Sequence, residues 1–450
     1  MKRLVFPDPG IEPERYELHG ELQHAFHRDH RVDRRRFFQI LGGGLVVLLL
    51  VDASPAQESG ERPRRRGGRG RGAPRPVELS AWLHIGENGE VTVFTGKAEV
   101  GQNIRTSLTQ AVAEELPVPP ASIQLVMADT DRVPFDMGTF GSRTTPDMAV
   151  QMRRVGAAAR DALIELAMQS FGVDRNVLRV ADGKVERTDS GESLSFGKLT
   201  RGQKLVKTID ERIPIKPATE WKIAGTSLGK VDGADFVTGT HQYASDVALP
   251  GMLHGKVLRP PAYEATLTSL DDTAARALPD VTIVRDGNFI GVAAPDSFTA
   301  TRALAALKPE WAEKAQPSSG ELFNLLAKER PAAANAQGNG SAQAGAPATD
   351  AGTADGGANN ADLQRIERRY AISYIAHAPL EPRAAVAQWQ DDKLTVWTGT
   401  QRPFGVRSEL ARTFAIDETK VRVIAPDTGA GYGGKHTGEA AIEAARLAKV

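Results

Sequence analysis

The chain has 450 residues, 41% of them hydrophobic and 25% charged, and equal numbers of basic and acidic residues give it a formal net charge of zero. This balance gives no argument for binding nucleic acid or an anionic membrane surface. Cysteine is absent, which excludes disulfides, thiolate zinc sites, cysteine nucleophiles and cysteine-ligated iron–sulfur clusters from this chain. Any electron relay that the chemistry requires must lie in a partner.

The amino terminus carries the pattern of an export signal. Asp33 to Gln39 reads D-R-R-R-F-F-Q, an apolar run extends from Ile40 to Val51, and the small residues Ser54 to Ala56 offer a cleavage site. As a helix the run would span about 18 Å, short of the ~30 Å hydrocarbon core, so no spanning helix is expected. The pattern resembles a twin-arginine signal over residues 1–56, which predicts export of the folded protein to the periplasm by the twin-arginine machinery. An uncleaved signal that associates with the membrane and a buried helix are the alternatives.

Two segments have the composition of linkers. Arg62 to Pro76 has no apolar side chain larger than Ala or Pro, so residues 57–76 are predicted to form a flexible basic tether. No aromatic residues interleave with its arginines, which argues against nucleic-acid binding. No Leu, Ile, Val, Phe or Met occurs between Leu326 and Leu363. Residues 326–362 are therefore predicted to be a linker or a surface insertion.

The remaining segments alternate strand and helix patterns. Leu79–Ile85 and Val91–Thr95 predict a hairpin around Asn88-Gly89. A helix is predicted from Ile104, and another from Thr145-Pro146 towards Met168. Further strands are predicted at 253–257, 281–285, 289–293, 395–397 and 421–425, and a further helix at 406–414. The fold class is α+β in several domains.

The most informative local feature is a glycine-rich turn at Asp427–Thr437, D-T-G-A-G-Y-G-G-K-H-T, between a predicted strand and a predicted helix over 438–449. Its glycines permit positive φ and let backbone N–H groups approach a ligand closely. The N-terminus of the following helix would favour an anion. These features predict a loop for a phosphate or a polar cofactor and do not distinguish between the two.

Two nucleotide-binding motifs and a plain helix-entry turn are alternatives for this loop. Gly429, Gly431 and Gly434 satisfy G-x-G-x-x-G, but the acidic residue expected about twenty positions later lies beyond Val450. Gly429 to Lys435 also imitates a P-loop, but His436 stands where Ser or Thr is required.

The same loop resembles the G-G-G-F-G-G-K loop of the xanthine dehydrogenase and aldehyde oxidase family. Trp397 to Gln401 resembles that family's T-Q segment, and Gly229 to Trp311 resembles its hammerhead domain. Glu99 to Gln102 resembles the E-M-G-Q-G segment, and Asp131 to Thr144 resembles the hydroxyl-rich pterin loop. The last two precede the glycine-rich loop here, an order similar to that of the isoquinoline 1-oxidoreductase beta-subunit group.

The resemblance implies an α+β, multidomain protein with a hammerhead domain and molybdopterin-binding domains. The expected parts are a permuted molybdopterin-binding segment at 77–220, a hammerhead-like domain at 221–325 and the start of the main molybdopterin-binding domain at 363–450. The carboxyl-terminal part of that domain, with the general-base glutamate, is expected beyond Val450. A non-catalytic fragment is the competing interpretation.

The resemblance also assigns roles to single residues. Gln102 is expected at the pyrophosphate of the cofactor and Gln401 beside the molybdenum ligands, and no residue is expected to ligate the metal directly. Tyr432 and His436 are expected in the substrate pocket, His436 replacing a Glu of many relatives, with a solvent-facing role as its alternative. His377 in H-A-P-L-E-P-R is a further candidate for the pocket. The complete set of expected cofactor-binding residues is Gln102, Thr139, Ser142, Thr144, Gln401, Gly431, Tyr432, Gly433 and Gly434.

The implied reaction is hydroxylation of an N-heteroaromatic carbon or an aldehyde with oxygen derived from water. The implied cofactor is molybdenum-molybdopterin in the cytosine dinucleotide form. Because the chain has no Cys, [2Fe-2S] clusters are expected only in a small partner subunit, which would pass electrons to a cytochrome c.

Overall fold

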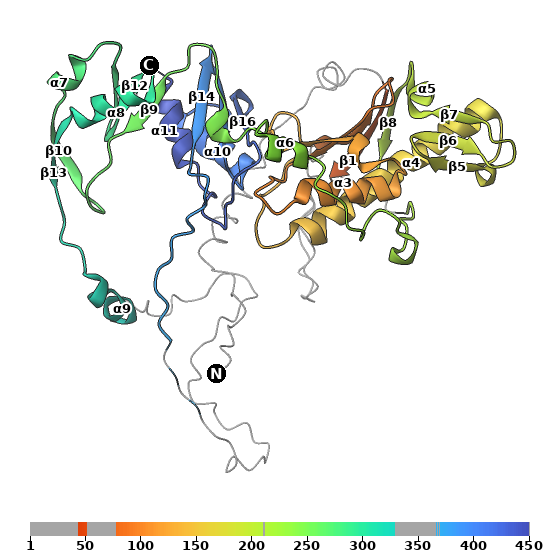
Figure 1. The fold of residues 1–450 in the computed structure, drawn as a ribbon, viewed down its shortest axis with the longest axis horizontal. Coiled ribbons are helices and arrows are strands. Elements are labelled where there is room, and N and C mark those ends of the chain that lie inside the picture. The colour runs from red at the N-terminus through yellow and green to blue at the C-terminus, as the bar shows by residue number, and fades with distance from the viewer. Residues whose placement is uncertain are drawn as a thin grey trace, which may run out of the picture.

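The computed structural model describes residues 44–51, 78–209, 212–328, 366, 368 and 370–449. The basic tether, most of the leader and most of the second linker lie outside these residues. Three α+β regions lie in a row (Figure 1). The middle region is made by the last elements of the chain, so the chain passes from the first region to the outer region and then returns between the two.

The first region is built on a five-stranded sheet in the order β4-β3-β2-β1-β8. The predicted hairpin is confirmed, because β2 pairs antiparallel with β3 and Gly86 N–H donates to Glu90 O across the turn. The outer pairs of the sheet, β3 with β4 and β1 with β8, are parallel. The strands are β1 (Gly44–Val51), β2 (Glu78–Ile85), β3 (Val91–Thr95), β4 (Ile123–Met127) and β8 (Lys204–Thr208).

The last eight residues of the apolar run, Gly44–Val51, form a strand within this sheet and not a helix. Leu45 and Val47 in β1 are completely buried, and Val47 pairs with Leu83 of β2. A short run of Val and Leu suits a strand that is buried on both faces, and periodicity cannot distinguish it from a buried helix. The buried-helix alternative is therefore wrong for residues 44–51. The rest of the predicted signal lies outside the described residues.

Two long helices pack together beside this sheet, and both were predicted. The spacing of Leu108 and Val112 gives α3 (Ile104–Glu115) a completely buried face. The second helix begins as a π-helix, η2 (Thr144–Ala149), and continues as α4 (Val150–Phe171). Gly156 lets the two helices approach closely, because a methyl group there would lie 3.0 Å from the Val112 carbonyl oxygen.

A small sheet, β5-β6-β7, extends this region at its outer end (Figure 1). The Ser195 side chain caps the short helix that follows by accepting from Lys198 N–H. These elements are β5 (Leu178–Ala181), β6 (Lys184–Arg187), β7 (Ser193–Ser195) and α5 (Phe196–Thr200). Short 3-10 helices among the described residues are η1 (Pro120–Ser122), η3 (Arg175–Val177), η4 (Ala218–Glu220), η5 (Ala244–Asp246) and η7 (Glu418–Lys420).

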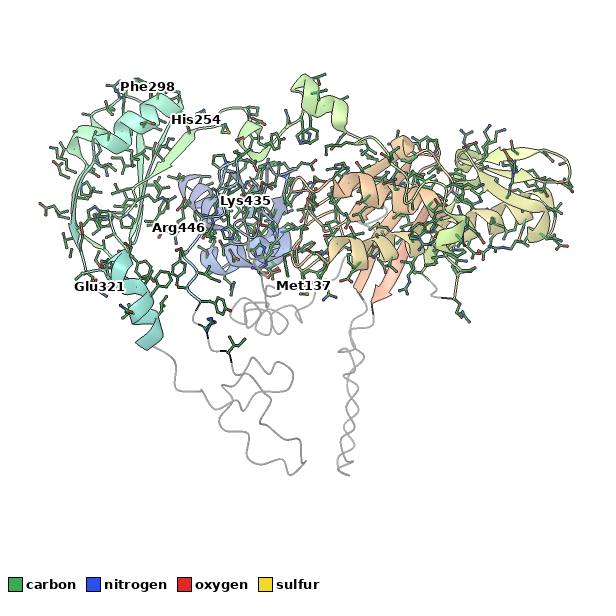
Figure 2. All side chains as sticks on the ribbon, turned by 60° about the horizontal axis from the view of Figure 1, so that its bottom comes forward. Met137, His254, Phe298, Glu321, Lys435 and Arg446 are labelled. Carbon is green, nitrogen blue, oxygen red and sulfur yellow. The ribbon has the colours of Figure 1, made fainter. Side chains whose placement is uncertain are left out.

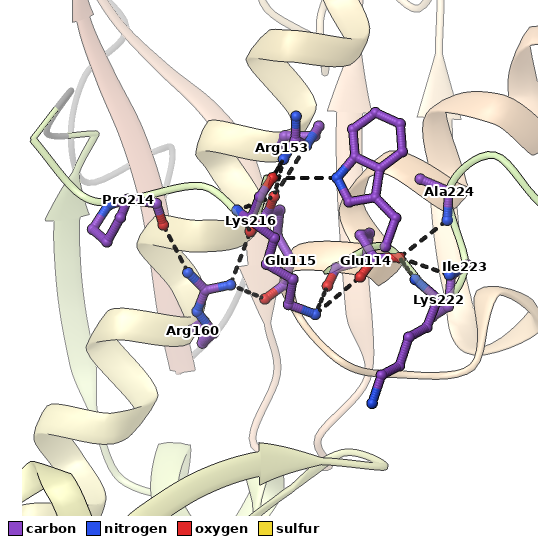
Figure 3. A network of polar contacts seen from close by, with 10 residues as sticks. Glu114, Glu115, Arg153, Arg160, Pro214, Lys216, Lys222, Ile223 and Ala224 are labelled. Carbon is purple, nitrogen blue, oxygen red and sulfur yellow. Dashed lines mark hydrogen bonds and ion pairs between the residues drawn. The ribbon is translucent and has the colours of Figure 1, made fainter. Parts of the chain in front are cut away.

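A buried acidic pair at the end of α3 fixes the segment that leaves this region (Figure 3). Glu114 accepts hydrogen bonds from the backbone N–H groups of Lys222, Ile223 and Ala224 at 2.8, 2.6 and 3.1 Å. Burial alone would raise the pKa of its carboxyl, but these donors and the Lys216 ammonium group outweigh burial and lower the pKa to about 2.

The neighbouring Glu115 completes this network (Figure 3). It pairs with Arg153 at 2.7 Å and Arg160 at 2.9 Å. Arg160 also donates to Pro214 O at 2.9 Å. The segment 214–224 is thereby bound to both long helices, and no feature of the sequence had indicated a role for Glu114 or Glu115.

The middle region is a three-stranded sheet in the order β14-β15-β16 with one helix between its parallel strands. The buried side chains Leu394, Val406 and Val423 form its core with two helices. The prediction of strands at 395–397 and 421–425 and of a helix at 406–414 is confirmed. The elements are β14 (Ala385–Gln390), β15 (Lys393–Thr398), α10 (Pro403–Phe414), β16 (Val421–Ile424) and α11 (Glu439–Leu447).

The outer region contains a three-stranded sheet, β11-β12-β9, and a two-stranded sheet, β10-β13. Ile290 and Val292 lie in its core beside Ala300 and Ala303 of α8. Its elements, with the connecting helix α6, are α6 (Gly233–Thr238), β9 (His254–Val257), β10 (Thr266–Asp271), α7 (Thr273–Arg276), β11 (Thr282–Asp286), β12 (Phe289–Ala294), α8 (Ser297–Ala305), β13 (Lys308–Ala312) and α9 (Ser319–Lys328). No helix among the described residues is both long enough and apolar enough to cross a membrane.

Candidate functional site

Two segments that are far apart in the sequence are joined at the start of the glycine-rich loop. The Thr130 N–H group donates to Val423 O at 3.0 Å, and the Ala425 N–H group donates to Ala128 O at 3.0 Å. Beside these bonds, Arg422 forms two hydrogen bonds with the Asp129 carboxylate, at 2.9 and 2.6 Å. The loop that follows β4 and the loop that follows β16 therefore begin side by side.

Gln401 lies at the centre of this junction and is almost fully buried. Its amide Nε2 donates to Thr139 O at 2.9 Å, and its Oε1 accepts from Gly433 N–H at 2.9 Å. Its backbone carbonyl accepts from Thr139 N–H at 2.8 Å, and its backbone N–H donates to Lys435 O at 2.9 Å. One residue thus connects the predicted pterin loop, the T-Q segment and the glycine-rich loop.

The glycines of the loop serve close packing more than unusual backbone angles. Of its glycines only Gly433 has positive φ, and Ala430 and Tyr432 also have positive φ. A methyl group at Gly431 would lie 2.5 Å from Gln401 Oε1, and one at Gly434 would lie 2.9 Å from His377 Cβ. The expectation that positive φ explains the glycines is wrong for most of them.

Lys435 points into the protein and not towards a ligand (Figure 2 shows its place in the middle region). It is 1% exposed, and its Nζ lies 2.7 Å from Glu381 Oε2. The same carboxylate oxygen accepts from Gly429 N–H at 2.8 Å, and Glu381 N–H donates to Gly429 O at 3.1 Å. A P-loop needs this Lys at a phosphate, so the geometry contradicts that interpretation.

Glu381 is the site residue that sequence reasoning missed. It belongs to the H-A-P-L-E-P-R segment, in which only His377 was a candidate. Arg383 of the same segment donates to Gly434 O at 2.6 Å. No pattern in the sequence pairs Glu381 with Lys435, because only the fold buries the ammonium group that then needs a carboxylate partner.

The N-terminus of α11 is occupied by a carboxylate of the chain itself. Gly438 N–H donates to Glu409 Oε2 at 2.7 Å, and burial raises the pKa of this carboxyl. One anionic group of the chain therefore already lies at this helix end, and a ligand anion there stays a prediction. The next carboxylates of α11 are engaged as well, because Glu439 accepts from the Thr437 hydroxyl and Glu443 pairs with Arg259.

The E-V-G-Q segment forms the entry to α3. Glu99 is buried and accepts from the N–H groups of Gly101 at 2.9 Å and Arg105 at 3.0 Å, so it caps the helix. Gln102 is exposed, and its side chain folds back on the turn, with Nε2 donating to Ala98 O at 3.2 Å. Thr428 N–H donates to Glu99 O at 2.8 Å, which binds this segment to the glycine-rich loop.

The predicted hydroxyl groups have different surroundings. Thr139 is buried, and its Oγ1 accepts from Ala98 N–H at 2.8 Å. Thr144 is buried at the start of η2, and Ser142 is exposed with φ of 54°. Ala98 therefore connects Gln102 and Thr139, while Ser142 lies at the surface of the same loop.

The two expected pocket residues differ in exposure. Tyr432 is 70% exposed. The His436 ring is partly buried and lies 5.2 Å from the Phe140 ring, centroid to centroid. His436 is thus in contact with the predicted pterin loop, and its solvent-facing alternative is not what the structure shows.

Three side chains beside the junction could together hold a metal ion: Asp232, His241 and Asp427, whose ligand atoms lie within 4.8 Å of one another. The two carboxylates already have cationic partners, because Arg105 lies 2.6 Å from Asp427 and Lys230 lies 3.0 Å from Asp232. The charges balance without a metal ion, so the group is adequately explained as an ion-pair network.

Comparison with known proteins identifies both sides of the junction. Residues 60–248 and residues 337–450 each match a family model described as a molybdopterin cofactor-binding domain. The chain belongs to the molybdopterin-binding subunits of the xanthine dehydrogenase and aldehyde oxidase family. The α+β class and the molybdopterin-binding domains predicted from the sequence are confirmed.

Curated relatives agree with this family. The chain is 33% identical over 383 residues to a nicotinate dehydrogenase subunit of Pseudomonas putida, covering 83% of this chain and 31% of the relative. It is 28% identical to a membrane-bound aldehyde dehydrogenase of Gluconacetobacter polyoxogenes that is named for pyrroloquinoline-quinone, covering 92% and 54%. It is 24% identical to the beta subunit of isoquinoline 1-oxidoreductase from Brevundimonas diminuta, covering 83% and 53%. The chain thus spans less than two thirds of the length of each of these relatives.

The residues at the junction fit an anionic pterin cofactor. Gln102 and Ser142 present exposed polar groups at the surface, next to the buried Thr139–Gln401 pair. Gly431 and Gly434 leave no room for a side chain beside Gln401 and His377, so the loop backbone packs directly against these two side chains. Neutral donors on a rigid backbone suit a buried phosphate or pterin, because such a group is costly to bury without hydrogen-bond donors.

Proposed function

We propose that this chain is the molybdenum-cofactor-binding part of a hydroxylase that oxidises N-heteroaromatic compounds or aldehydes. The observation that carries the proposal is Gln401, which joins the pterin loop at Thr139 to the glycine-rich loop at Gly433. The names of the relatives, a nicotinate dehydrogenase and an isoquinoline oxidoreductase among them, support this substrate class.

In this proposal, the chain's own residues position the cofactor and the substrate. Gln102, Ser142 and Thr144 donate to the anionic cofactor, and Gln401 is kept in one orientation by its bonds to both loops. Such fixed orientation lowers the cost of reorganisation during a reaction. When bound, the cofactor supplies two-electron oxidation with oxygen derived from water. Tyr432 and His436 line the substrate side.

The proposed cofactor form is the cytosine dinucleotide, and the proposed partners are a small subunit with [2Fe-2S] clusters and a cytochrome c. The absence of cysteine supports a separate electron-transfer subunit, because cysteine thiolates ligate such clusters. Export to the periplasm by the twin-arginine route, with association to the membrane if the signal is uncleaved, is proposed on the R-R-R-F-F pattern at residues 34–38.

The test is co-expression of the full-length protein with its small subunit, followed by metal and nucleotide analysis. Stoichiometric molybdenum with a pterin nucleotide, and reduction of a cytochrome or dye by nicotinate, isoquinoline or benzaldehyde, is the expected result. A molybdenum-free complex that oxidises none of these compounds would support the non-catalytic alternative. Fractionation of cells and amino-terminal sequencing of the exported protein test the localisation separately.

A further inference from the structure

Arg402, which follows Gln401, is a buried cation with almost no partner among the described residues. It is 9% exposed, and its Nε has no hydrogen-bond partner. Its guanidinium makes one long hydrogen bond, from Nη1 to His436 O at 3.5 Å, and no ion pair with any described carboxylate. A guanidinium does not deprotonate in proteins, so a buried one requires anionic or strong acceptor partners.

Two glycines make the space in which this side chain lies. A methyl group at Gly405 would lie 2.8 Å from Arg402 Nη2, and one at Gly138 would lie 2.7 Å from Arg402 Cγ. The guanidinium therefore lies against the first turn of α10, and its stem crosses the loop that carries Thr139. The backbone N–H of Arg402 donates to Thr400 Oγ1 at 3.0 Å, which fixes the start of the side chain.

The position of Arg402 adds its positive charge to the partial positive charge at the N-terminus of α10. The first-turn N–H groups of a helix carry partial positive charge and attract anions. Arg402 places a full positive charge against that end of α10, a helix of 12 residues. Burial lowers the pKa of Arg402, and the attraction of Glu409, whose carboxylate bonds to Gly438 N–H, does not compensate for this burial.

We propose that Arg402 and the first turn of α10 bind an oxyanion, a carboxylate or a phosphate, at the edge of the cofactor site. Both groups match the planar fork of a guanidinium, which can donate two parallel hydrogen bonds to them. The neighbours of Arg402 place this oxyanion at the edge of the cofactor site. Gln401 directly precedes Arg402 in the chain, and Arg402 Nη1 contacts the backbone carbonyl of His436. The oxyanion belongs either to the substrate, as a carboxylate on a pyridine ring, or to the cofactor, as its phosphate.

The experiment compares the Arg402→Met and Arg402→Lys variants with Arg412→Met, a matched control on the exposed face of the same helix. Each variant is prepared as the full-length protein with its small subunit. Thermal unfolding is measured without added anion, with inorganic phosphate and with nicotinate. Phosphate or nicotinate is expected to raise the Tm of the wild type and of Arg412→Met, and to raise that of Arg402→Met much less.

Two further measurements identify the source of the oxyanion. If it is a substrate carboxylate, Arg402→Met and Arg402→Lys raise the KM for nicotinate by about 10- to 100-fold with little change in kcat, because a charge-assisted pair contributes about 1.5–3 kcal/mol. The KM for neutral nicotinamide then changes little. If it is the cofactor phosphate, the variants lose pterin nucleotide, and the KM of the remaining active enzyme is unchanged.

Two outcomes would overturn the oxyanion site. One is equal stabilisation of the wild type and Arg402→Met by phosphate and by nicotinate, together with unchanged KM and pterin content. The other is a large loss of Tm for Arg402→Met without anions, with no response of the wild type to anions, which would assign the partner carboxylate to the protein itself. The substrate measurement rests on the proposed function, whereas the unfolding measurement does not. If anions raise the Tm but the complex oxidises none of the substrates, the proposed function is therefore rejected and the oxyanion site at Arg402 stands.

Discussion

The first region and the outer region are attached to the middle of the molecule in different ways. The first region meets it through buried groups that are specific to their partners, such as Thr139 with Gln401 and Asp129 with Arg422. The outer region meets it through helix α11, where Leu447 lies close to Gly255 and Gly291 and Arg259 pairs with Glu443. The family models match residues on both sides of the first junction and do not include 249–336. The first junction is thus held by specific buried hydrogen bonds, and the second by glycine packing and an exposed ion pair.

Breaking the buried pair below the glycine-rich loop is expected to have the largest effect. Lys435→Met leaves the Glu381 carboxylate buried without its cation, so we expect the free energy of unfolding to fall by about 3–5 kcal/mol. Urea denaturation measures this, and molybdenum content should fall with it. The double variant Lys435→Met/Glu381→Leu should recover most of the loss. A single variant as stable as the wild type would contradict the buried pairing.

Acid should weaken the first region through Glu114. Its pKa is about 2 in the folded protein against an ordinary 4.5, so the unfolded state binds the proton more tightly. The stabilisation is therefore complete above pH 4.5 and is lost as the pH falls from about 4.5 to about 2, and it amounts to about 3 kcal/mol. Unfolding free energies across this range test it. Glu114→Gln should flatten the pH dependence there, and an unchanged slope would contradict the prediction.

A methyl group at the centre of the first junction should have a moderate effect. Gly431→Ala would place its Cβ 2.5 Å from Gln401 Oε1, and the strain should cost about 1–3 kcal/mol. We expect reduced molybdenum content and a lower kcat in the purified complex. Gly229→Ala, at a position with open space around it, is the control and should match the wild type. Full activity of Gly431→Ala would show that the loop shifts without loss.

The smallest effect is expected at the outer junction. Arg259 is well exposed where it pairs with Glu443, and exposed ion pairs contribute about 0–1 kcal/mol. Arg259→Ala should therefore change the unfolding free energy by less than about 1 kcal/mol and leave molybdenum content unchanged. If this variant loses its cofactor, the outer region has a larger part in the site than its contacts suggest.

The sequence alone was sufficient to predict the elements whose structure depends on local residue patterns. The hairpin at Asn88-Gly89, α3 with Leu108 and Val112, and the strand–helix–strand order of the middle region were all predicted correctly. Gln401 and Thr139 were both predicted as cofactor-binding residues, and the structure brings them into direct contact.

The residues that could not be predicted act through distant partners. No local pattern gave a role to Glu381 or Glu114, and Glu99 was placed only in a segment that resembles E-M-G-Q-G. The fold buries all three and supplies their N–H or cationic partners. β1 was missed for another reason, since an apolar run of this length fits an export signal, a helix or a buried strand equally well. Gly429 to Lys435 imitates a P-loop because a motif records the spacing of residues and not the direction of a side chain, and the Lys435 side chain pairs with Glu381.

The position of β1 has a consequence for the order of events during synthesis. Its parallel partner β8 is made about 160 residues later than β1 itself, so this pairing has high contact order and forms late. At about 5–20 residues per second, the ribosome needs roughly 10–30 s to reach β8. During that interval the apolar run has at most β2 beside it. In the proposed export route, the export machinery and the sheet therefore compete for the same eight residues. The rate of translation then helps to determine whether the leader is recognised before the sheet is complete.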